Sequence, residues 1–512
     1  MTQAREGFSS RWLMMLAMLG MAVGTGNIWR FPRIAAQNGG GEFLVAWVAF
    51  LFLWSIPLIM VEFGMGRWTR SGPVKAFAQL MGPKFAWMGA FVAFVAIAIM
   101  CYYSVVAGWT LRYVLAAVTG EVPGAEPGAL WSNYTTSWWP SVTHALAIGL
   151  GVFVVARGVR AIESVARILM PALLLLVVIL TVRAVTLPGA SDGLAYLFGI
   201  DWHRLGDATI WLNALTQNAW DTGAGWGLVL VYAAYLRQGE DTALNAVILP
   251  TANNVVSLFA GVMVICTVFS VVQELAGTVA ANPDAFAAYP QFGAAVAAGE
   301  PITADLVQST IFDSGNTGLT FIWMPQLFAR VPFGNVFMVL FFLALAVAAF
   351  TSLVAMIELA TRVLTDFGVT RRRAVQITGA FGFLAGIPSA MSLAVLDNQD
   401  WVWGVALMVS GLFFAIAVMT VGVRRFREEQ LNHPDSNIRV GVWWDIVIRV
   451  LVPLQAVILM VWWLWQARGW DPTGWLNPLD TFSVGTVLAQ WALLLVILLA
   501  ANRWMVRRME EH

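Results

Sequence analysis

Three glycines, Gly20, Gly24 and Gly26, interrupt a long apolar run near the start of the chain and are followed at once by Asn27. Each lowers helix propensity by about 1 kcal/mol relative to Ala. Backbone that leaves a helix at membrane depth must face protein or water, because lipid offers no hydrogen-bond partner. Freed carbonyls can hold a cation, and the N–H groups that start a half-helix can hold an anion. The stretch Leu19–Pro32 therefore predicts a broken membrane span with a binding site, and close helix packing through the GxxxG spacing is the alternative.

A second broken segment, QNAWDTGAGWG at residues 217–227, interrupts a later apolar run in the same way. It carries Asp221, and a carboxylate at mid-membrane costs several kcal/mol unless a cation accompanies it. Two glycine-interrupted spans at corresponding positions of two halves indicate the binding site of a secondary transporter. Five spans separate the two breaks, so an odd number of crossings per half inverts one half relative to the other. We therefore expect an inverted repeat with broken helices 1 and 6.

Other kinds of chemistry find little support in the chain. The stretch GASDG at residues 189–193 is formally G-x-S-x-G, but it follows an expected helix and not a strand. The four histidines, at positions 144, 203, 433 and 512, are scattered, and the two cysteines lie inside apolar runs. We expect neither an enzyme nor a site built on His or Cys ligands.

The composition identifies the elements that must position these breaks. The chain has 512 residues, of which 59% are hydrophobic and 11% are charged, as is typical of a polytopic membrane protein. The fold class expected is all-α, with one membrane domain over residues 1–512. Runs long enough to cross about 30 Å of hydrocarbon predict twelve transmembrane helices, near residues 11–36, 41–67, 87–117, 142–156, 164–183, 208–235, 243–272, 334–364, 373–394, 399–423, 444–466 and 482–502. The two repeats would span about 11–184 and 208–423, with helices 11 and 12 at about 444–502 outside them.

Basic residues gather in alternate connections, for example at Arg67 and Arg70, at 371–373 and at 503–508. The positive-inside rule places these connections and both termini in the cytoplasm. The longer opposite loops at 118–141 and 273–333 are poor in Lys and Arg. We expect a multi-pass protein of the inner (plasma) membrane whose surroundings are the lipid bilayer. A net charge of zero gives no reason to expect nucleic acid.

Several motifs, in order along residues 5–505, carry a resemblance to a known family. They are GMAVGTGNIWRFP at 20–32, NGGGEF at 38–43, MVEFGMGR at 60–67, YYSVVAGWTL at 102–111 and FTSLVAMIE at 350–358. The chain resembles the neurotransmitter:sodium symporter family, in particular its bacterial amino-acid transporters of the leucine-transporter type. The resemblance implies that family's inverted-repeat fold and sodium as the coupling ion.

The resemblance further implies two sodium sites. The first is made by the carbonyls of Gly20, Val23 and Ala348 and the hydroxyls of Thr351 and Ser352. The second uses positions that match Ala22, Asn27, Asp221 and Asn253, together with the substrate carboxylate. Asp221 departs from the family pattern, which has Thr or Ser there. Without the partner at residues 20–23, bonding of the two hydroxyls to their own helix would be the simpler reading of Thr351 and Ser352.

The substrate pocket implied by the resemblance has polar backbone at one end and apolar walls. Its residues are Met21, Thr25, Gly26, Ile99, Tyr103, Trp220, Gly223, Trp226, Ser352 and Met356. The N–H groups at Thr25 and Gly26, with the Tyr103 hydroxyl, would take a carboxylate. Gly24 stands where monoamine carriers of the family have an Asp, which disfavours a monoamine. The two indoles leave the size of the substrate side chain open.

Gating pairs are also implied. Arg30 would pair with Asp400 on the outside, and Arg5 with Asp366, supported by Tyr235, on the inside. Glu62, in the second span, is expected to accept hydrogen bonds from the unwound part of the sixth. Glu358, where relatives often have Gln, receives no role from the sequence.

The function expected is sodium-coupled symport of neutral, mainly apolar amino acids by alternating access. Chloride-requiring relatives place hydroxyls at the positions of Asp221 and Ser257, so we expect the Asp221 carboxylate to replace chloride. Two alternatives stay open: a sodium-dependent carrier of an amine-bearing ligand, and a substrate sensor on the same fold. The sequence leaves open which amino acid is carried, the sodium stoichiometry, proton counter-transport and whether the protein forms a homodimer.

Overall fold

The computed structural model describes residues 7–122, 128–237, 239–286, 289–434 and 436–511, and these residues form helices joined by turns, without a strand among them. Among these residues, nine helices are long and apolar enough to cross a bilayer, and two bent pairs pass the same test when each pair is taken together. The pairs are Arg11–Ala22 with Gly26–Gln37, bent by 54°, and Ala129–Thr135 with Trp139–Val155, bent by 79°. The all-α membrane fold is therefore confirmed.

The first five spans and their connections are as follows: α1 (Arg11–Ala22), η1 (Gly26–Arg30) and α2 (Phe31–Gln37); α3 (Gly41–Phe50), η2 (Leu51–Ser55) and α4 (Ile56–Thr69); α5 (Pro73–Met81), η3 (Pro83–Phe85) and α6 (Ala86–Thr119); α7 (Ala129–Thr135) and α8 (Trp139–Val155); α9 (Val159–Val185) and α10 (Ala190–Phe198).

The remaining elements are η4 (Arg204–Gly206), α11 (Ala208–Asp221) and α12 (Leu228–Ala233); α13 (Thr242–Ala281), η5 (Pro283–Phe286), α14 (Pro290–Ala297), α15 (Ala304–Asp313), α16 (Gly315–Thr317), η6 (Gly318–Trp323) and α17 (Met324–Phe328); α18 (Gly334–Asp366); α19 (Arg371–Met391); α20 (Leu393–Val421), α21 (Val423–Phe426) and η7 (Arg427–Leu431); α22 (Trp443–Ile446), η8 (Val447–Leu451) and α23 (Val452–Trp470); and α24 (Val484–Glu510).

The sixth span is divided between α11 and α12, neither of which is long enough to cross alone. They pack one after the other along the second span, α11 against α3 and α12 against α4. Because α3, η2 and α4 run without a gap from Gly41 to Thr69, the two half-helices lie end to end beside a continuous crossing helix. Counted with this pair, the described chain has the twelve crossing segments that the sequence predicts. The repeat boundaries stay a prediction.

Capping side chains begin several of these helices where the sequence changes from polar to apolar. Ser10 accepts from the Leu13 amide at the start of α1, and Asp241 accepts from the Leu244 amide at the start of α13. Ser392 caps α20 directly after α19 ends. Each cap satisfies one of the amides that a helix start leaves without a partner.

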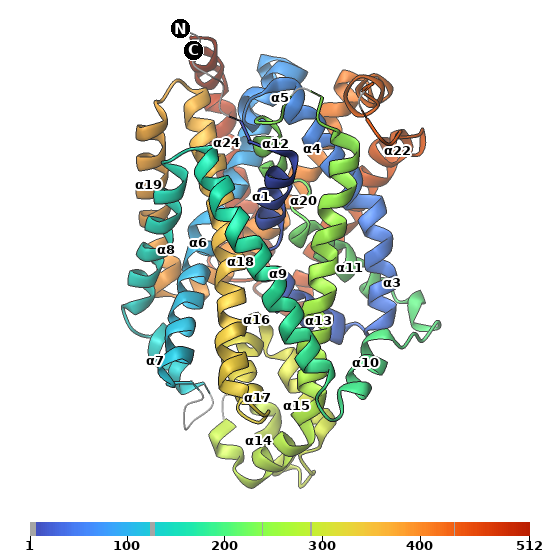
Figure 1. Cartoon of the computed structure of the whole chain (residues 1–512), viewed down its shortest axis with the longest axis vertical. Coiled ribbons are helices and arrows are strands. Elements are labelled where there is room, and N and C mark those ends of the chain that lie inside the picture. The colour runs from blue at the N-terminus through green and yellow to red at the C-terminus, as the bar shows by residue number, and fades with distance from the viewer. Residues whose placement is uncertain (1–6, 123–127, 238, 287–288, 435, 512) are drawn as a thin grey trace.

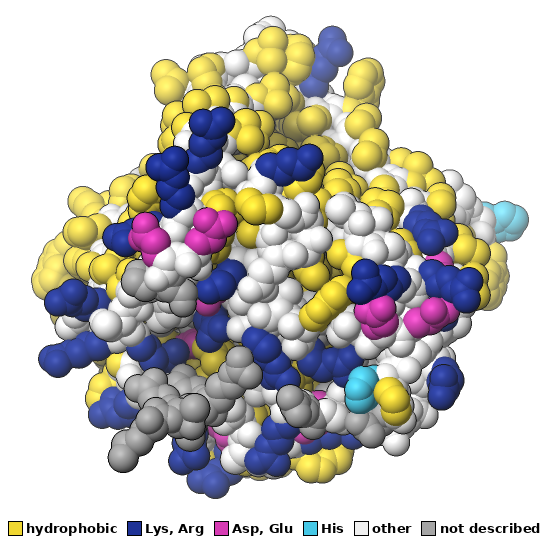
Figure 2. All heavy atoms as spheres, turned by 90° about the horizontal axis from the view of Figure 1, so that it is seen from above, with side chains coloured by type: hydrophobic (Ala, Val, Ile, Leu, Met, Phe, Trp, Pro, Cys, Tyr) yellow, Lys and Arg dark blue, Asp and Glu magenta, His cyan; other side chains and the backbone are white. Residues whose placement is uncertain are grey.

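Both marked chain ends lie at one end of the helix bundle, whereas α7, α10 and α14 lie at the opposite end (Figure 1). The end that carries the termini is rich in Lys and Arg when seen face on (Figure 2). Its exposed basic residues include Arg160, Arg372, Arg373, Arg425 and Arg507. This is the face that the sequence predicts to be cytoplasmic.

Candidate functional site

The first broken span opens the backbone for three residues. α1 ends at Ala22, and Val23 is extended, with φ −73° and ψ 98°. The Gly24 amide leaves the helix pattern and donates to Asn27 Oδ1 at 2.8 Å, so the side chain of Asn27 replaces a helical acceptor. The Thr25 amide likewise donates to the Tyr103 hydroxyl at 3.1 Å, so the carbonyls of Gly20 and Met21 lose their helical donors, as a cation site requires.

The second break lies between Asp221, where α11 ends, and Leu228, where α12 begins. Gly223, Gly225 and Gly227 have φ of 75°, 87° and 78°, a left-handed conformation that side chains disfavour. Buried Glu62 accepts from the Gly225 amide at 2.7 Å and from the Leu230 amide at 3.1 Å. The role expected for Glu62 is confirmed.

The five residues of the first predicted sodium site lie together where α18 crosses the break in span 1. The Ser352 hydroxyl lies 3.4, 3.1 and 3.4 Å from the carbonyl oxygens of Gly20, Met21 and Val23. The Thr351 hydroxyl bonds within its own helix, to the carbonyls of Val347 at 3.0 Å and Ala348 at 3.2 Å. The Ser352 hydroxyl and the three carbonyls around it are the hard oxygen ligands that a small cation prefers.

The second predicted sodium site is a network of buried amides and hydroxyls. Asn27 Nδ2 donates to Asn253 Oδ1 at 2.9 Å and to Ser257 Oγ at 2.7 Å. Ser257 Oγ and Gln217 Nε2 both donate to Asp221 Oδ2 at 3.1 Å. The other carboxylate oxygen of Asp221 is buried and has no hydrogen-bond partner among the described residues. An unsatisfied buried carboxylate oxygen fits a cation ligand, because burial without a partner is costly.

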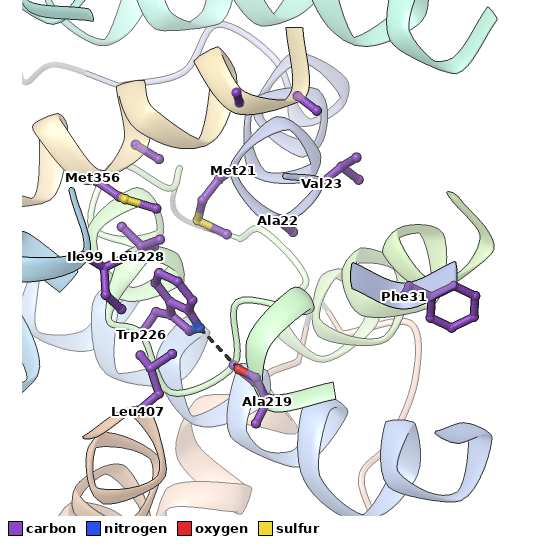
Figure 3. Packing of buried hydrophobic residues seen from close by; sticks show 14 of the residues in the cluster. Met21, Ala22, Val23, Phe31, Ile99, Ala219, Trp226, Leu228, Met356 and Leu407 are labelled. Atoms are coloured by element: carbon purple, nitrogen blue, oxygen red, sulfur yellow. Dashed lines mark hydrogen bonds between the residues drawn. The ribbon is translucent and has the colours of Figure 1, made fainter. Parts of the chain in front are cut away.

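A cavity of about 310 Å³ lies between the two breaks. Nine of the ten residues predicted to bind substrate line it, and so do Ala22, Asn27 and Asp221: the nine are Met21, Thr25, Gly26, Tyr103, Trp220, Gly223, Trp226, Ser352 and Met356. The tenth, Ile99, is fully buried and lies in the packed cluster that contains Met356 and Trp226 (Figure 3). The cavity walls at this depth are therefore mainly apolar.

One end of the cavity presents hydrogen-bonding groups. The Thr25 amide donates to the Tyr103 hydroxyl at 3.1 Å. A Cβ at Gly24 would lie 3.0 Å from both Tyr103 Oη and Ser352 Oγ, so a side chain there would require these neighbours to shift. Gly24 brings no carboxylate of the protein to this end, which leaves it available to a carboxylate of the substrate.

The outer gate residues face the same cavity, but they are not paired with each other in the described part of the chain. Arg30 donates to Gln217 Oε1 at 2.5 Å, and its guanidinium lies 5.8 Å from the centre of the Trp220 ring. Asp400 accepts from the Tyr102 hydroxyl at 2.9 Å. The cavity continues between them as far as Leu396 and Phe482. The predicted Arg30–Asp400 pair thus stays a prediction for a closed outer gate.

The inner gate differs in part from the sequence prediction. Arg5 lies outside the described residues. Asp366 accepts from the Gly72 amide at 2.6 Å and pairs with Arg362 at 3.2 Å. The Tyr235 hydroxyl was expected to support Asp366 but donates to Glu358 at 2.7 Å.

Glu358 thereby gains a role that the sequence did not supply. Its buried carboxylate also pairs with Arg371, at 2.6 and 3.1 Å, and the same guanidinium donates to the Val155 carbonyl at 2.8 Å. These contacts join α8, α18, α19 and the end of span 6. The sequence indicated only that Glu358 is a carboxylate where relatives often have Gln. It could not indicate the partners Tyr235 and Arg371, because they lie outside α18.

Comparison with known proteins identifies the family. The sequence profile of the Sodium:neurotransmitter symporter family matches residues 5–139 and 135–507. An uncharacterised sodium-dependent transporter of Methanocaldococcus jannaschii is 27% identical, with 89% of this chain and 90% of the relative covered. The sodium-dependent serotonin transporter of Drosophila melanogaster is 26% identical, with 90% and 76% covered.

Among solved structures, that of MhsT in complex with L-phenylalanine matches with a TM-score of 0.72 and 26% identity, over 90% of this chain and 99% of that one. These relatives are transporters and not enzymes. The broken spans, the oxygen-lined break and the cavity between them agree with this match. The chain belongs to the Sodium:neurotransmitter symporter family and is a sodium-dependent symporter with its multi-pass helical fold.

Proposed function

We propose that this symporter uses the sodium gradient to accumulate a neutral, mainly apolar amino acid. The observation that carries the proposal is the division of the cavity. At one end the Tyr103 hydroxyl accepts from the Thr25 amide and keeps its own O–H as a donor, while Met21, Trp226 and Met356 form apolar walls. This donor suits an α-carboxylate and the walls suit an uncharged side chain. The L-phenylalanine bound by MhsT is a ligand of this class.

Sodium is co-transported in this proposal and held by protein oxygens. The convergence of the Ser352 hydroxyl on three carbonyls supports the first site. Ala22, Asn27 and Asp221 border the cavity and support the second site, where the substrate carboxylate adds a ligand. Sharing a carboxylate between substrate and ion makes the two bind cooperatively, which is a basis for coupling.

Asp221 supplies the fixed negative charge that accompanies sodium, and transport is independent of chloride. The support is its hydrogen bond from Ser257, at the two positions where chloride-requiring relatives have hydroxyls. Two unit charges about 4 Å apart interact by about 4 kcal/mol at an effective dielectric near 20. A carboxylate at this place therefore increases sodium occupancy without a bound anion.

Alternating access moves the substrate across the inner (plasma) membrane, with both termini cytoplasmic. The proposal is supported by the basic face that carries the termini and by the contrast between the two gates. The cavity reaches between Arg30 and Asp400, whereas Glu358 joins three helices and Tyr235 on the opposite side of the cavity. The arrangement corresponds to an outward-facing state.

A carrier of an amine-bearing ligand is the second candidate, because Asp221 borders the cavity and one of its carboxylate oxygens has no hydrogen-bond partner among the described residues. A substrate sensor on the same fold is the third. A binding screen of the amino acids on purified protein, with and without sodium, tests the first against the second. We expect sodium-dependent binding of neutral amino acids, and a preference for amines lacking a carboxylate would contradict it. Counterflow in proteoliposomes separates a carrier from a sensor, since a sensor exchanges no substrate.

A further inference from the structure

Trp220, the half-buried indole of the substrate cavity, rests against a glycine of α20. A Cβ placed on Gly404 would lie 2.2 Å from Trp220 Cζ2, 3.1 Å from Cε2 and 3.2 Å from Cη2. These atoms form the edge of the six-membered ring, and 2.2 Å is far inside van der Waals contact. Gly is a poor helix former compared with Ala, so its presence inside α20 is not explained by helix propensity. The contact with Trp220 explains it.

The two indoles of the cavity are held differently. Trp226 is buried and its indole N–H donates to the Ala219 carbonyl at 3.2 Å, which fixes the ring (Figure 3). Trp220 packs edge-on against it at 5.9 Å between ring centres, but no described residue accepts a hydrogen bond from its N–H. Trp220 is therefore positioned by ring contacts with Trp226 and the Arg30 guanidinium and by packing, and the packing at one edge is set by Gly404.

Space lies on the far side of Trp220. A second cavity of about 270 Å³ shares Trp220, Arg30 and Asp400 with the substrate cavity, and Gly404 lines only this second one. Its walls are otherwise largely apolar, with Met408, Leu459 and Trp463 among them. An indole without a hydrogen bond, between two cavities, can shift toward the second when a bulky group fills the first.

We propose that Gly404 is a specificity-determining residue, which seats Trp220 so that the transporter accepts neutral amino acids with large aromatic side chains. The inference rests on the proposed amino-acid symport and adds the size class of the side chain. Methionine sulfur and indole edges make favourable contacts with aromatic rings, so Met21, Met356 and Trp226 suit such a side chain. Any side chain at position 404 would push Trp220 into the substrate cavity and exclude the largest substrates first.

The test compares wild type, Gly404→Ala, Trp220→Phe and the double variant, in sodium, by competition of a radiolabelled neutral amino acid with L-alanine, L-phenylalanine and L-tryptophan. We expect wild type to bind all three. Gly404→Ala should lose at least tenfold in affinity for the aromatic pair and less than threefold for L-alanine. The double variant should recover aromatic binding to within threefold, because Phe lacks the ring edge that meets Gly404.

Gly149→Ala is the matched control, since a Cβ on this glycine of α8 meets no atom within 4 Å. Equal loss for all three amino acids in Gly404→Ala, or unchanged aromatic binding, would overturn the inference and leave the proposed function standing. A wild type that binds L-alanine but neither L-phenylalanine nor L-tryptophan would also overturn the inference and leave the proposed function standing. Absence of sodium-dependent binding of any neutral amino acid would overturn the proposed function itself. If Gly404→Ala does not fold, Trp220→Phe alone tests the inference. We expect this variant to bind L-tryptophan more tightly relative to L-alanine than wild type does, and an unchanged ratio of the two affinities would overturn the inference.

Discussion

The hydroxyl of Ser257 on α13 donates a hydrogen bond of 3.1 Å to Asp221 at the end of α11, so a carboxylate from either position can reach the same place. This proximity makes the source of the negative charge testable. We expect wild-type uptake to be equal in chloride and gluconate media. Asp221→Ser should be inactive or should need chloride, because it removes the fixed charge and leaves two hydroxyls. Radiolabelled uptake in the two media measures this.

The double variant Asp221→Ser/Ser257→Glu is the control, since it returns one carboxylate from the neighbouring helix. It should recover chloride-independent transport. A wild type that requires chloride, or an Asp221→Ser variant that behaves like wild type in gluconate, would refute the role given to Asp221.

The hydroxyls of Thr351 and Ser352 are expected to be essential for sodium affinity. Replacing both by Ala removes two oxygen ligands but no backbone, so the protein should remain folded while its apparent sodium affinity falls by at least tenfold, or about 1.4 kcal/mol. Sodium titration of substrate binding on purified protein measures the change. Thr361→Ala is the matched control on α18, because its buried hydroxyl bonds only to the Ile357 carbonyl at 2.8 Å in the described structure. Equal sodium affinity in the control and the double variant would contradict the site.

Glu358→Gln tests the inner closure. Because the Arg371 side chain is 22% exposed, we expect a smaller cost than the about 3–5 kcal/mol of breaking a fully buried pair. The loss falls on contacts that join four elements on the side opposite the outer cavity. The population of the outward-facing state should fall, and apparent substrate affinity in sodium should fall with it by about tenfold. Tyr235→Phe should act in the same direction.

The two changes should not add fully in the double variant, because both weaken the same charge-assisted hydrogen bond between Tyr235 and residue 358. Equilibrium binding of all four proteins completes a double-mutant cycle. Strict additivity, or full affinity in Glu358→Gln, would show that this contact does not hold the inner side closed.

The positions of both breaks could be predicted from sequence because glycine acts locally. Gly24 lies at the first break, and Gly223, Gly225 and Gly227 adopt the left-handed backbone that other residues avoid. The twelve crossing segments follow from runs of apolar residues. In both cases the signal lies within the element itself.

Contacts between distant elements could not be predicted in the same way. Tyr235 and Glu358 are 123 residues apart, and only packing reveals that they bond. In the sequence Gly404 does not differ from other glycines of an apolar helix, and only the packing places Trp220 against it. The outer pair of Arg30 and Asp400 depends on conformational state, since each side chain has another partner here.

The Tyr102 hydroxyl holds Asp400 through one carboxylate oxygen while the outer gate is open, so we expect Tyr102→Phe to release Asp400 and favour the closed gate. A hydrogen bond to a charged group is worth about 1.5–3 kcal/mol, and we expect about a tenfold slower dissociation of bound amino acid in sodium. Tyr113→Phe is the control on the same helix α6, because its buried hydroxyl has no hydrogen-bond partner among the described residues. Dissociation of radiolabelled substrate after dilution measures both variants.

Adding Asp400→Asn to Tyr102→Phe should cancel the slower dissociation, since an amide cannot pair with Arg30 as a carboxylate does. Faster dissociation in Tyr102→Phe, or an equal effect of Tyr113→Phe, would show that the Tyr102–Asp400 bond does not restrain the gate.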